Sequence, residues 1–190
     1  GRSAVAAAAY RSGTKLTNEY DGITHDYTKK NWIEHSEIFL PVQAQKCFGE
    51  RSTLWNSVES IEKSGNAQLA REFEVALPIE LSPEERYHLV QEFIQKNLVE
   101  HGMCVDLAIH NPPLTNGFHV PIDKDGNPTT DKEAMIFQNP HAHIMTTMRP
   151  LDADGKWMDK YEKSYLCRKD NEELAIPSSK IREAEAEGWQ

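Results

Sequence analysis

Three segments of this chain repeat their side-chain character with a period of two, and this pattern constrains the fold more than any other feature. They are residues 72–77, 103–110 and 141–149. A period of two is typical of a β-strand, because successive side chains point to opposite faces of a sheet. A shorter run at residues 37–40 ends at Pro41. The sequence therefore predicts a β-sheet built from these segments.

Helical signals lie between the predicted strands. Ser82, Pro83 and Glu85 form a strong helix start, with a capping serine, a proline in the first turn and an acid at the third position. Ser3 and Gly13 bracket an alanine-rich run, as expected of a short helix with a cap at each end. Helices are accordingly predicted at residues 4–11, 51–63, 83–102 and 180–187. The chain should adopt a mixed α/β (α+β) fold with one face of the sheet under the helices.

The other face of the predicted sheet gathers polar residues, and its histidines are the sharpest local feature. His141 and His143 lie two residues apart on one strand, so their imidazoles project from the same side and can converge on one metal ion. His110, at the end of another strand, is in phase with them. Three neutral imidazoles leave positions open for a substrate oxygen, as in a catalytic metal site. Exposed surface histidines are the alternative. The polar side chains assigned to this face are Glu72, Glu74, Asp106, His110, His141, His143 and Arg149.

Tyr10 is a candidate nucleophile at the end of the alanine-rich helix. A phenol is mostly protonated at neutral pH and must be activated by a base or by nearby positive charge. The carboxyl end of a helix disfavours negative charge, so a metal ion and Arg11 would have to compensate. A tyrosine that only packs against its neighbours is the alternative interpretation.

Composition limits the classes of function. The net charge of −9 over 190 residues argues against a protein that coats DNA nonspecifically. Residues 1–46 nevertheless carry six Lys and Arg against five Asp and Glu, so a local DNA-binding surface is expected there and near Arg149. The cysteines, with no paired spacing, indicate free thiols in a reducing cytoplasm; they are Cys47, Cys104 and Cys167. No run approaches the ~20 apolar residues that cross a membrane.

Several ordered motifs resemble the MobA/MobL relaxases, which include TraA-type conjugation proteins. The motifs are GRSAVAAAAYRSG at residues 1–13, DGITHDYTKK at 21–30, EIFLP at 37–41, AREFEVALP at 70–78, VDLAIH at 105–110 and NPHAHIM at 139–145. The resemblance covers residues 1–166. It implies the His-hydrophobe-His endonuclease fold, an antiparallel sheet of about five strands flanked by helices. The first family strand precedes the GRS motif and is expected to be missing from this chain.

The resemblance also implies roles for individual residues. Tyr10 corresponds to the family nucleophile, and His110, His141 and His143 correspond to the metal ligands. The supporting carboxylate falls on residues 71–77, where Glu72 is favoured over Glu74 as a base or as the group that orients a metal-bound histidine. Mg²⁺ or Mn²⁺ is the expected cofactor, although imidazoles also accept Zn²⁺, Co²⁺ or Ni²⁺. Phosphate contacts are expected from Arg11, Lys15, Lys29, Lys30 and Arg149, each of which is otherwise a solvated surface charge.

The function implied is a site- and strand-specific DNA relaxase for conjugative plasmid mobilisation, acting through a 5′-phosphotyrosine. Its partners would be single-stranded or supercoiled DNA at a transfer origin, with accessory relaxosome and coupling proteins, in the cytoplasm and away from membranes. Two alternatives remain open: a metal-dependent phosphoesterase that uses activated water, and a non-enzymatic, metal-stabilised interaction module. Residues 167–190 are expected to be a polar extension that begins a linker or a further region.

One segment departs from the family pattern. Residues 111–138 form a polar excursion that is longer than usual, with a turn expected at Asp125 and Gly126. Asp123 to Gly126 superficially resembles a calcium-binding loop, but the glycine falls at the fourth position rather than the sixth. The sequence therefore predicts no calcium site there and assigns the excursion no role.

Overall fold

A computed structural model describes residues 3–62, 64–170 and 172–190 of the chain. It contains two compact units, Gly1–Trp157 and Met158–Gln190. Gly1 and Arg2, which begin the first family motif, and Lys63, at the predicted end of a helix, lie outside the described residues. No helix in the described ranges has both the length and the apolar character needed to span a membrane.

The centre of the first unit is an antiparallel sheet with the order β3-β5-β6-β4. Its strands are β3 (Ile33–Phe39), β4 (Ala70–Ala76), β5 (Val105–His110) and β6 (His141–Thr147). All four predicted segments are therefore strands of one sheet. Within the described residues this sheet has four strands, where the resemblance implied about five. β5 and β6 are its central pair, and His110 faces His141 in their register.

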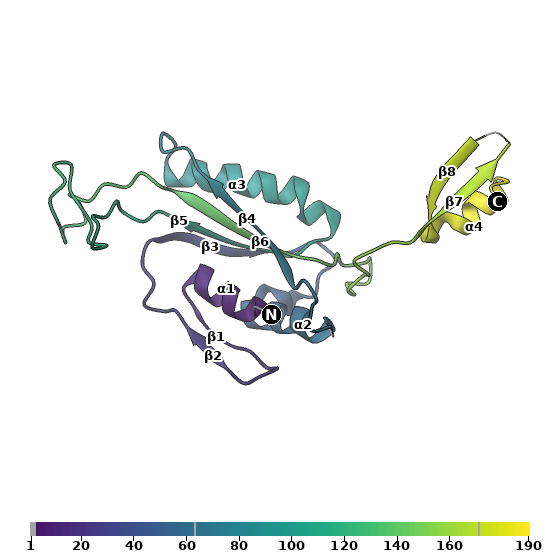
Figure 1. Ribbon diagram of the computed structural model, residues 1–190, viewed down its shortest axis with the longest axis horizontal. Helices are drawn as coiled ribbons and strands as arrows, with labels where there is room; N and C mark the ends of the chain where they lie inside the picture. Colours follow the sequence, from purple (N-terminus) through teal and green to yellow (C-terminus); the bar gives the residue numbers. More distant parts are fainter. Residues whose placement is uncertain (1–2, 63, 171) are drawn as a thin grey trace. The chain divides into compact units, whose positions relative to one another are not determined.

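Helices cover both faces of this sheet, whereas the sequence predicted helices on only one. In Figure 1, α3 (Pro83–Asn97) lies on one side, and α1 (Ala4–Ser12) and α2 (Arg51–Ile61) lie on the other. The prediction was wrong because Asp106 alternates with aliphatic residues, a pattern that is typical of a sheet with one face exposed to solvent. Its carboxylate is buried beneath α2, where Arg51 and the indole N–H of Trp55 donate hydrogen bonds to it at 2.8–2.9 Å.

The face under α3 is apolar along β5 and β6. Leu107, Ile109 and Ile144 are almost fully buried there against Val90 and Ile94 of the helix. The predicted capping box fixes the start of α3, since Ser82 accepts from the Glu85 amide and the Glu85 carboxylate accepts from the Ser82 amide. A short turn, η2 (Val99–His101), follows α3 and ends at Gly102 with a φ of 86°. This layer is an ordinary hydrophobic core.

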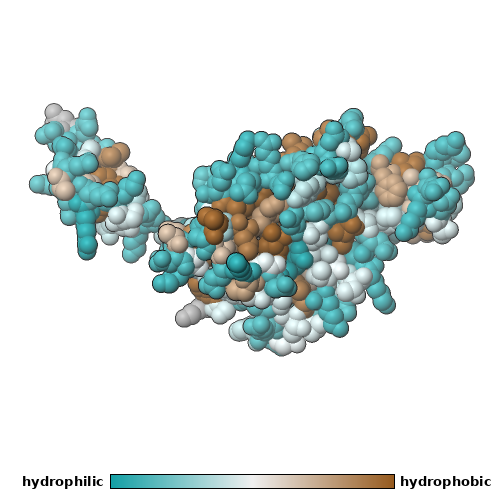
Figure 2. All heavy atoms as spheres, turned by 180° about the vertical axis from the view of Figure 1, so that it is seen from behind, coloured by the Kyte–Doolittle hydropathy of each residue, from teal (hydrophilic) through white to brown (hydrophobic). Residues whose placement is uncertain are grey.

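The face under α1 and α2 is apolar only in part. Val5 and Ala9 of α1 pack with Trp55 of α2 and with Met145 of the sheet. A short hairpin that the sequence analysis missed, β1 (Lys15–Thr17) and β2 (Thr24–Asp26), follows α1 and adds Leu16 to this cluster. The 3₁₀ turn η1 (Lys46–Gly49) precedes α2 and adds Phe48. Apolar side chains also reach the surface, as Figure 2 shows for the face it views.

The excursion between β5 and β6 has no regular helix or strand among its described residues. Isolated bridges hold it together, including Pro113 with Phe137 and Ile122 with Pro128. The predicted turn at Gly126 is present, with a φ of 81°. One oxygen of Asp123 accepts hydrogen bonds from two backbone amides of its own turn. The excursion begins and ends at the histidines that pair across β5 and β6.

The second unit has a regular structure of its own. It consists of the hairpin β7 (Ser164–Lys169) and β8 (Glu172–Pro177), the turn η3 (Ser178–Lys180) and the helix α4 (Ile181–Ala186). Cys167, Ile176 and Ala184 form its small core. The predicted division after residue 166 falls inside β7, and the compact units separate earlier, after Trp157, because β7 and β8 pair with each other.

Candidate functional site

Three histidines meet at one end of the central strand pair. His110 is the last residue of β5, His141 is the first residue of β6, and His143 follows on the same face. Their ring centroids lie 4.8–5.5 Å apart, and one nitrogen from each lies within 4.8 Å of the others. His110 and His143 are buried, and His141 is half-buried. The structure thus brings together all three predicted metal ligands.

Each imidazole has a hydrogen-bond acceptor that fixes its tautomer. Nε2 of His110 donates to the carbonyl of Arg11 at 2.7 Å, and Nδ1 of His141 donates to the carbonyl of Asn139 at 2.8 Å. Nδ1 of His143 donates to the carboxylate of Glu72 at 2.8 Å. A carbonyl or ionised carboxylate oxygen can only accept, so in the neutral form of each ring the other nitrogen carries the lone pair. These partners suit metal ligation, because they orient each ring and leave one donor atom available.

His110 stays neutral at physiological pH. Burial lowers its pKa from the usual 6.5 to about 4, and the nearby ammonium of Lys30 acts in the same direction. The hydrogen bond to the Arg11 carbonyl opposes these effects and does not cancel them. Since only a neutral imidazole can bind a metal ion, His110 is already in the form that a ligand needs.

Glu72 of β4 joins the histidines to α1. The hydrogen bond from His143, together with Arg11 and against the effect of burial, lowers the pKa of Glu72 to about 2. Arg11 donates to both carboxylate oxygens, at 2.5 and 3.0 Å. Glu72 is therefore ionised at neutral pH and suits the orienting role better than that of a proton-accepting base. Glu74 is exposed, and its charge only raises the pKa of Arg11 slightly, so the contacts favour Glu72.

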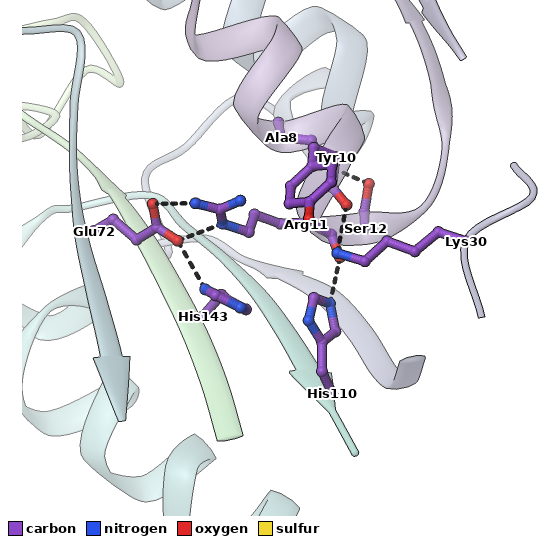
Figure 3. A network of polar contacts seen from close by, with 8 residues as sticks. All are labelled: Ala8, Tyr10, Arg11, Ser12, Lys30, Glu72, His110 and His143. Carbon is purple, nitrogen blue, oxygen red and sulfur yellow. Dashed lines mark hydrogen bonds and ion pairs between the residues drawn. The ribbon is translucent and has the colours of Figure 1, made fainter. Parts of the chain in front are cut away.

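Tyr10 lies in the last turn of α1, beside the histidines. Figure 3 shows Tyr10 and Arg11 at the end of the helix, with Glu72 and His143 on one side and His110 and Lys30 below. The Tyr10 residue is 44% exposed to solvent. The rings of Tyr10 and Tyr27 pack edge to face, with their centroids 5.2 Å apart.

Two sets of contacts fix α1 in this position. At its beginning, Glu59 of α2 accepts from the Ser3 hydroxyl at 2.7 Å and from the Val5 amide at 3.0 Å, and buried Asn18 donates to the same carboxylate. At its end, Gly13 has a φ of 64°, and a Cβ there would meet Ile33 at 2.4 Å. The sequence analysis missed Glu59 and Asn18, because nothing local in their sequence links them to α1.

The predicted phosphate contacts fall into two groups. Arg11 and Lys30 lie at the site, Lys15 is 3.6 Å from Asp26, and Lys29 is exposed next to Lys30. The structure does not bring Arg149 to the site. It follows β6 at the end away from the histidines, about 20 Å along the strand, and its guanidinium pairs with buried Glu62 at 2.8 Å.

The donor set fits a divalent cation. It offers one nitrogen from each of three imidazoles, each ring oriented by its hydrogen-bond partner, and it lies beside partly exposed Tyr10. Three protein ligands leave coordination positions for substrate oxygens. Imidazole is an intermediate ligand that does not distinguish Mn²⁺ from Zn²⁺, Co²⁺ or Ni²⁺.

Comparison with known proteins finds a family model and relatives named for conjugal transfer and mobilization. The family model described as the MobA/MobL family matches residues 2–190. The conjugal transfer protein TraA of Agrobacterium fabrum is 36% identical over 82% of this chain and 13% of its own length. The mobilization protein MobL of Acidithiobacillus ferridurans is 36% identical over 82% of this chain and 41% of its own. This chain thus spans less than half the length of these relatives.

A solved structure supports the same relationship. It was reported as the molecular basis of vancomycin resistance transfer in Staphylococcus aureus. It is 31% identical, with a TM-score of 0.66, and the similarity covers 98% of this chain and 79% of that one. At this identity the likeness extends beyond the topology of the sheet to the sequence that forms it.

Proposed function

This chain belongs to the MobA/MobL family, and we propose on that premise that it nicks one DNA strand at a transfer origin, with Tyr10 as the nucleophile. The observation that carries the proposal is the pair of contacts made by Arg11. Its carbonyl accepts from His110, and its side chain binds Glu72, which binds His143. Through its neighbour in the chain, Tyr10 is thus tied to two of the three candidate ligands.

The proposed reaction is a transesterification. Tyr10 gives up its phenolic proton to solvent, its oxygen forms a bond to the scissile phosphorus, and the bond from phosphorus to the 3′-oxygen breaks. The 3′-oxygen leaves with the electron pair and takes up a proton, which gives a free 3′-hydroxyl and a 5′-phosphotyrosine. One phosphate ester replaces another, so the step can be reversed without ATP. Nicking and later rejoining can therefore use the same site.

The residues around Tyr10 have distinct roles in this proposal. His110, His141 and His143 would hold Mg²⁺ or Mn²⁺, which when bound would polarise the phosphate and offset the charge of the transition state. Glu72 orients His143 and keeps Arg11 in place. The guanidinium of Arg11 pairs with Glu72 and lies 5.1 Å from the centroid of the Tyr10 ring.

We assign the substrate to DNA because of both the relatives and the charges. Relatives named for conjugal transfer and mobilization support a transfer origin as the target, with relaxosome and coupling proteins as partners in the cytoplasm. Lys15, Lys29 and Lys30 are the candidates for phosphate contact beside Tyr10. Nicking would reside in residues 1–166, the span of the predicted relaxase domain, and residues 167–190 would begin a further region.

The test is a plasmid relaxation assay. The protein is incubated with Mn²⁺ and a supercoiled plasmid that carries the cognate origin. We expect relaxed DNA with protein attached, loss of the adduct in Tyr10→Phe and loss of cleavage in His141→Ala. Tyr20→Phe and His88→Ala are matched controls, because both residues are exposed and lie outside the site. Metal-dependent cleavage that persists in Tyr10→Phe would identify a phosphoesterase that uses water instead.

A further inference from the structure

One ammonium group contacts Tyr10 in two ways. Nζ of Lys30 donates a hydrogen bond to the Tyr10 carbonyl at 3.0 Å, and the same atom lies 3.9 Å from the centroid of the Tyr10 ring. Figure 3 shows the Lys30 side chain reaching the end of α1 from a separate segment. A cation over the face of an aromatic ring is attracted by the electrons of that face. Lys30 therefore holds both the backbone and the ring of the proposed nucleophile.

The position of Lys30 is set by a fixed turn. The amide of Lys30 donates to the carbonyl of Tyr27 at 2.9 Å, and the amide of Tyr27 donates to the carbonyl of Thr14. Asp26 accepts hydrogen bonds from both the amide and the hydroxyl of Thr28. Because the turn is held to the chain that follows α1, Lys30 is placed by structure and does not behave as a free surface arm.

A positive charge on Lys30 is energetically unfavourable at this position. Lys30 is half-buried, and burial, with Arg11 acting in the same direction, lowers its pKa to about 8. In the described part of the chain Lys30 forms no ion pair with a carboxylate, while Lys29 is exposed to solvent. A charge kept where burial and a neighbouring cation oppose it often has a functional role.

Tyr10 needs a positive charge in this place. Its phenolic oxygen is most negative when it attacks phosphorus and when it departs on rejoining. The carboxyl end of α1 disfavours that charge, because the carbonyls of the last turn point towards it. The groups that face Tyr10 are Arg11, Tyr27 and Lys30. Arg11 is already neutralised by Glu72, so Lys30 is the cation that remains to offset the helix end.

We propose that Lys30 is a positioning residue for Tyr10, and that it binds the last turn of α1 and stabilises the phenolate form of the ring. This inference rests on the proposed function in one respect: the phenolate has a reaction to perform only if Tyr10 attacks DNA. In this role Lys30 differs from Lys29, Lys15 and the other candidate phosphate contacts, because Lys30 acts on the nucleophile rather than on DNA alone.

The test uses a reaction that needs no DNA. Tetranitromethane nitrates tyrosines as phenolates, and peptide mass spectrometry follows Tyr10 separately from the other tyrosines. At pH 7, below the Lys30 pKa of about 8, Lys30→Met should slow nitration of Tyr10 roughly fivefold, while exposed Tyr20 in the same molecule reacts at an unchanged rate. Lys30→Arg should restore most of the rate, and Lys29→Met should leave nitration of Tyr10 unaltered. Thermal unfolding of each variant checks that the fold is intact.

The outcomes separate this inference from the proposed function. An unchanged or faster nitration of Tyr10 in Lys30→Met, or no recovery in Lys30→Arg, overturns the role of Lys30. If wild-type protein forms no adduct with origin DNA, nicking is refuted while the nitration result still stands. With DNA, Lys30→Met should slow single-turnover adduct formation at saturating DNA. An effect on DNA affinity alone would make Lys30 a phosphate contact and would also overturn the inference.

Discussion

The two faces of the central sheet are built for different tasks. Under α3 the core of the layer is apolar, formed by aliphatic side chains and Phe39. Under α1 and α2 the aliphatic cluster gives way to histidines, Glu72 and Arg11 towards the carboxyl end of α1. The same two strands, β5 and β6, supply both faces. Alternate residues of one strand point to opposite faces of the sheet. Stability and chemistry can therefore be changed separately by substitutions on the two faces.

The largest effect is expected on the aliphatic face. Ile94→Ala removes a fully buried side chain of α3 and should lower the free energy of unfolding by about 3 kcal/mol, through lost burial and the cavity left behind. Urea denaturation measures the loss. Adduct formation per folded molecule should stay at the wild-type level below the unfolding transition. A parallel loss of activity in folded protein would show that the two faces are coupled.

Arg149 tests how far the functional part of the other face extends. Arg149→Met takes away the guanidinium that faces the buried carboxylate of Glu62, and it should lower the free energy of unfolding by about 2 kcal/mol. DNA affinity should not change, because Arg149 lies at the opposite end of β6 from the histidines. A clear fall in DNA affinity, measured by fluorescence anisotropy, would restore the role in phosphate binding that the sequence suggested.

Glu72 should control the metal site more than the fold. Glu72→Gln keeps the shape of the side chain but removes the charge that His143 and Arg11 share. Loss of such a supporting acceptor typically costs 10- to 100-fold in metal affinity, or about 2 kcal/mol. Isothermal titration with Mn²⁺ measures this, with Glu74→Gln as the matched control. Equal effects of the two substitutions would contradict the assignment of Glu72.

The smallest expected effect is a pH dependence of stability in the metal-free protein. Burial lowers the pKa of His110 from 6.5 to about 4, so between these pH values the unfolded chain binds a proton that the folded chain does not. The stability from His110 is fully present above about pH 6.5 and is lost as the pH falls towards 4. Between pH 6.5 and pH 5.5 we expect a loss of roughly 1 kcal/mol. The loss due to Glu72, whose pKa is about 2, comes at lower pH.

A His110→Asn variant checks that assignment. Its stability should fall less between pH 6.5 and pH 4.5 than that of the wild type, as measured by urea denaturation at both pH values. An identical pH dependence in the two proteins would show that other groups cause the loss.

The sequence was most informative where the determinants are local. The caps of α1 and α3 are short motifs, and both helices begin at the predicted residue. The period of two correctly placed the histidines on one face. The three-residue strands β1 and β2 are too short to show a period, and they were missed.

What the sequence could not supply was contact between distant segments. The hydrogen bonds from Arg11 to Glu72 and from Asn18 to Glu59 join residues far apart in the chain. The burial of Asp106 also depends on a contact between distant segments. Its alternation with aliphatic residues indicates a solvated face, and only the fold reveals that Arg51 neutralises it. The sequence could thus identify the residues of the candidate site, but not the hydrogen bonds that connect them.

The most direct measurement is to map the covalent link between protein and DNA. Origin DNA is incubated with the protein and Mn²⁺, the adduct is digested with protease and nuclease, and the modified peptide is sequenced by mass spectrometry. The account predicts a nucleotide attached through its 5′-phosphate to Tyr10. A nucleotide on any other residue, or cleavage with no modified peptide, would contradict it.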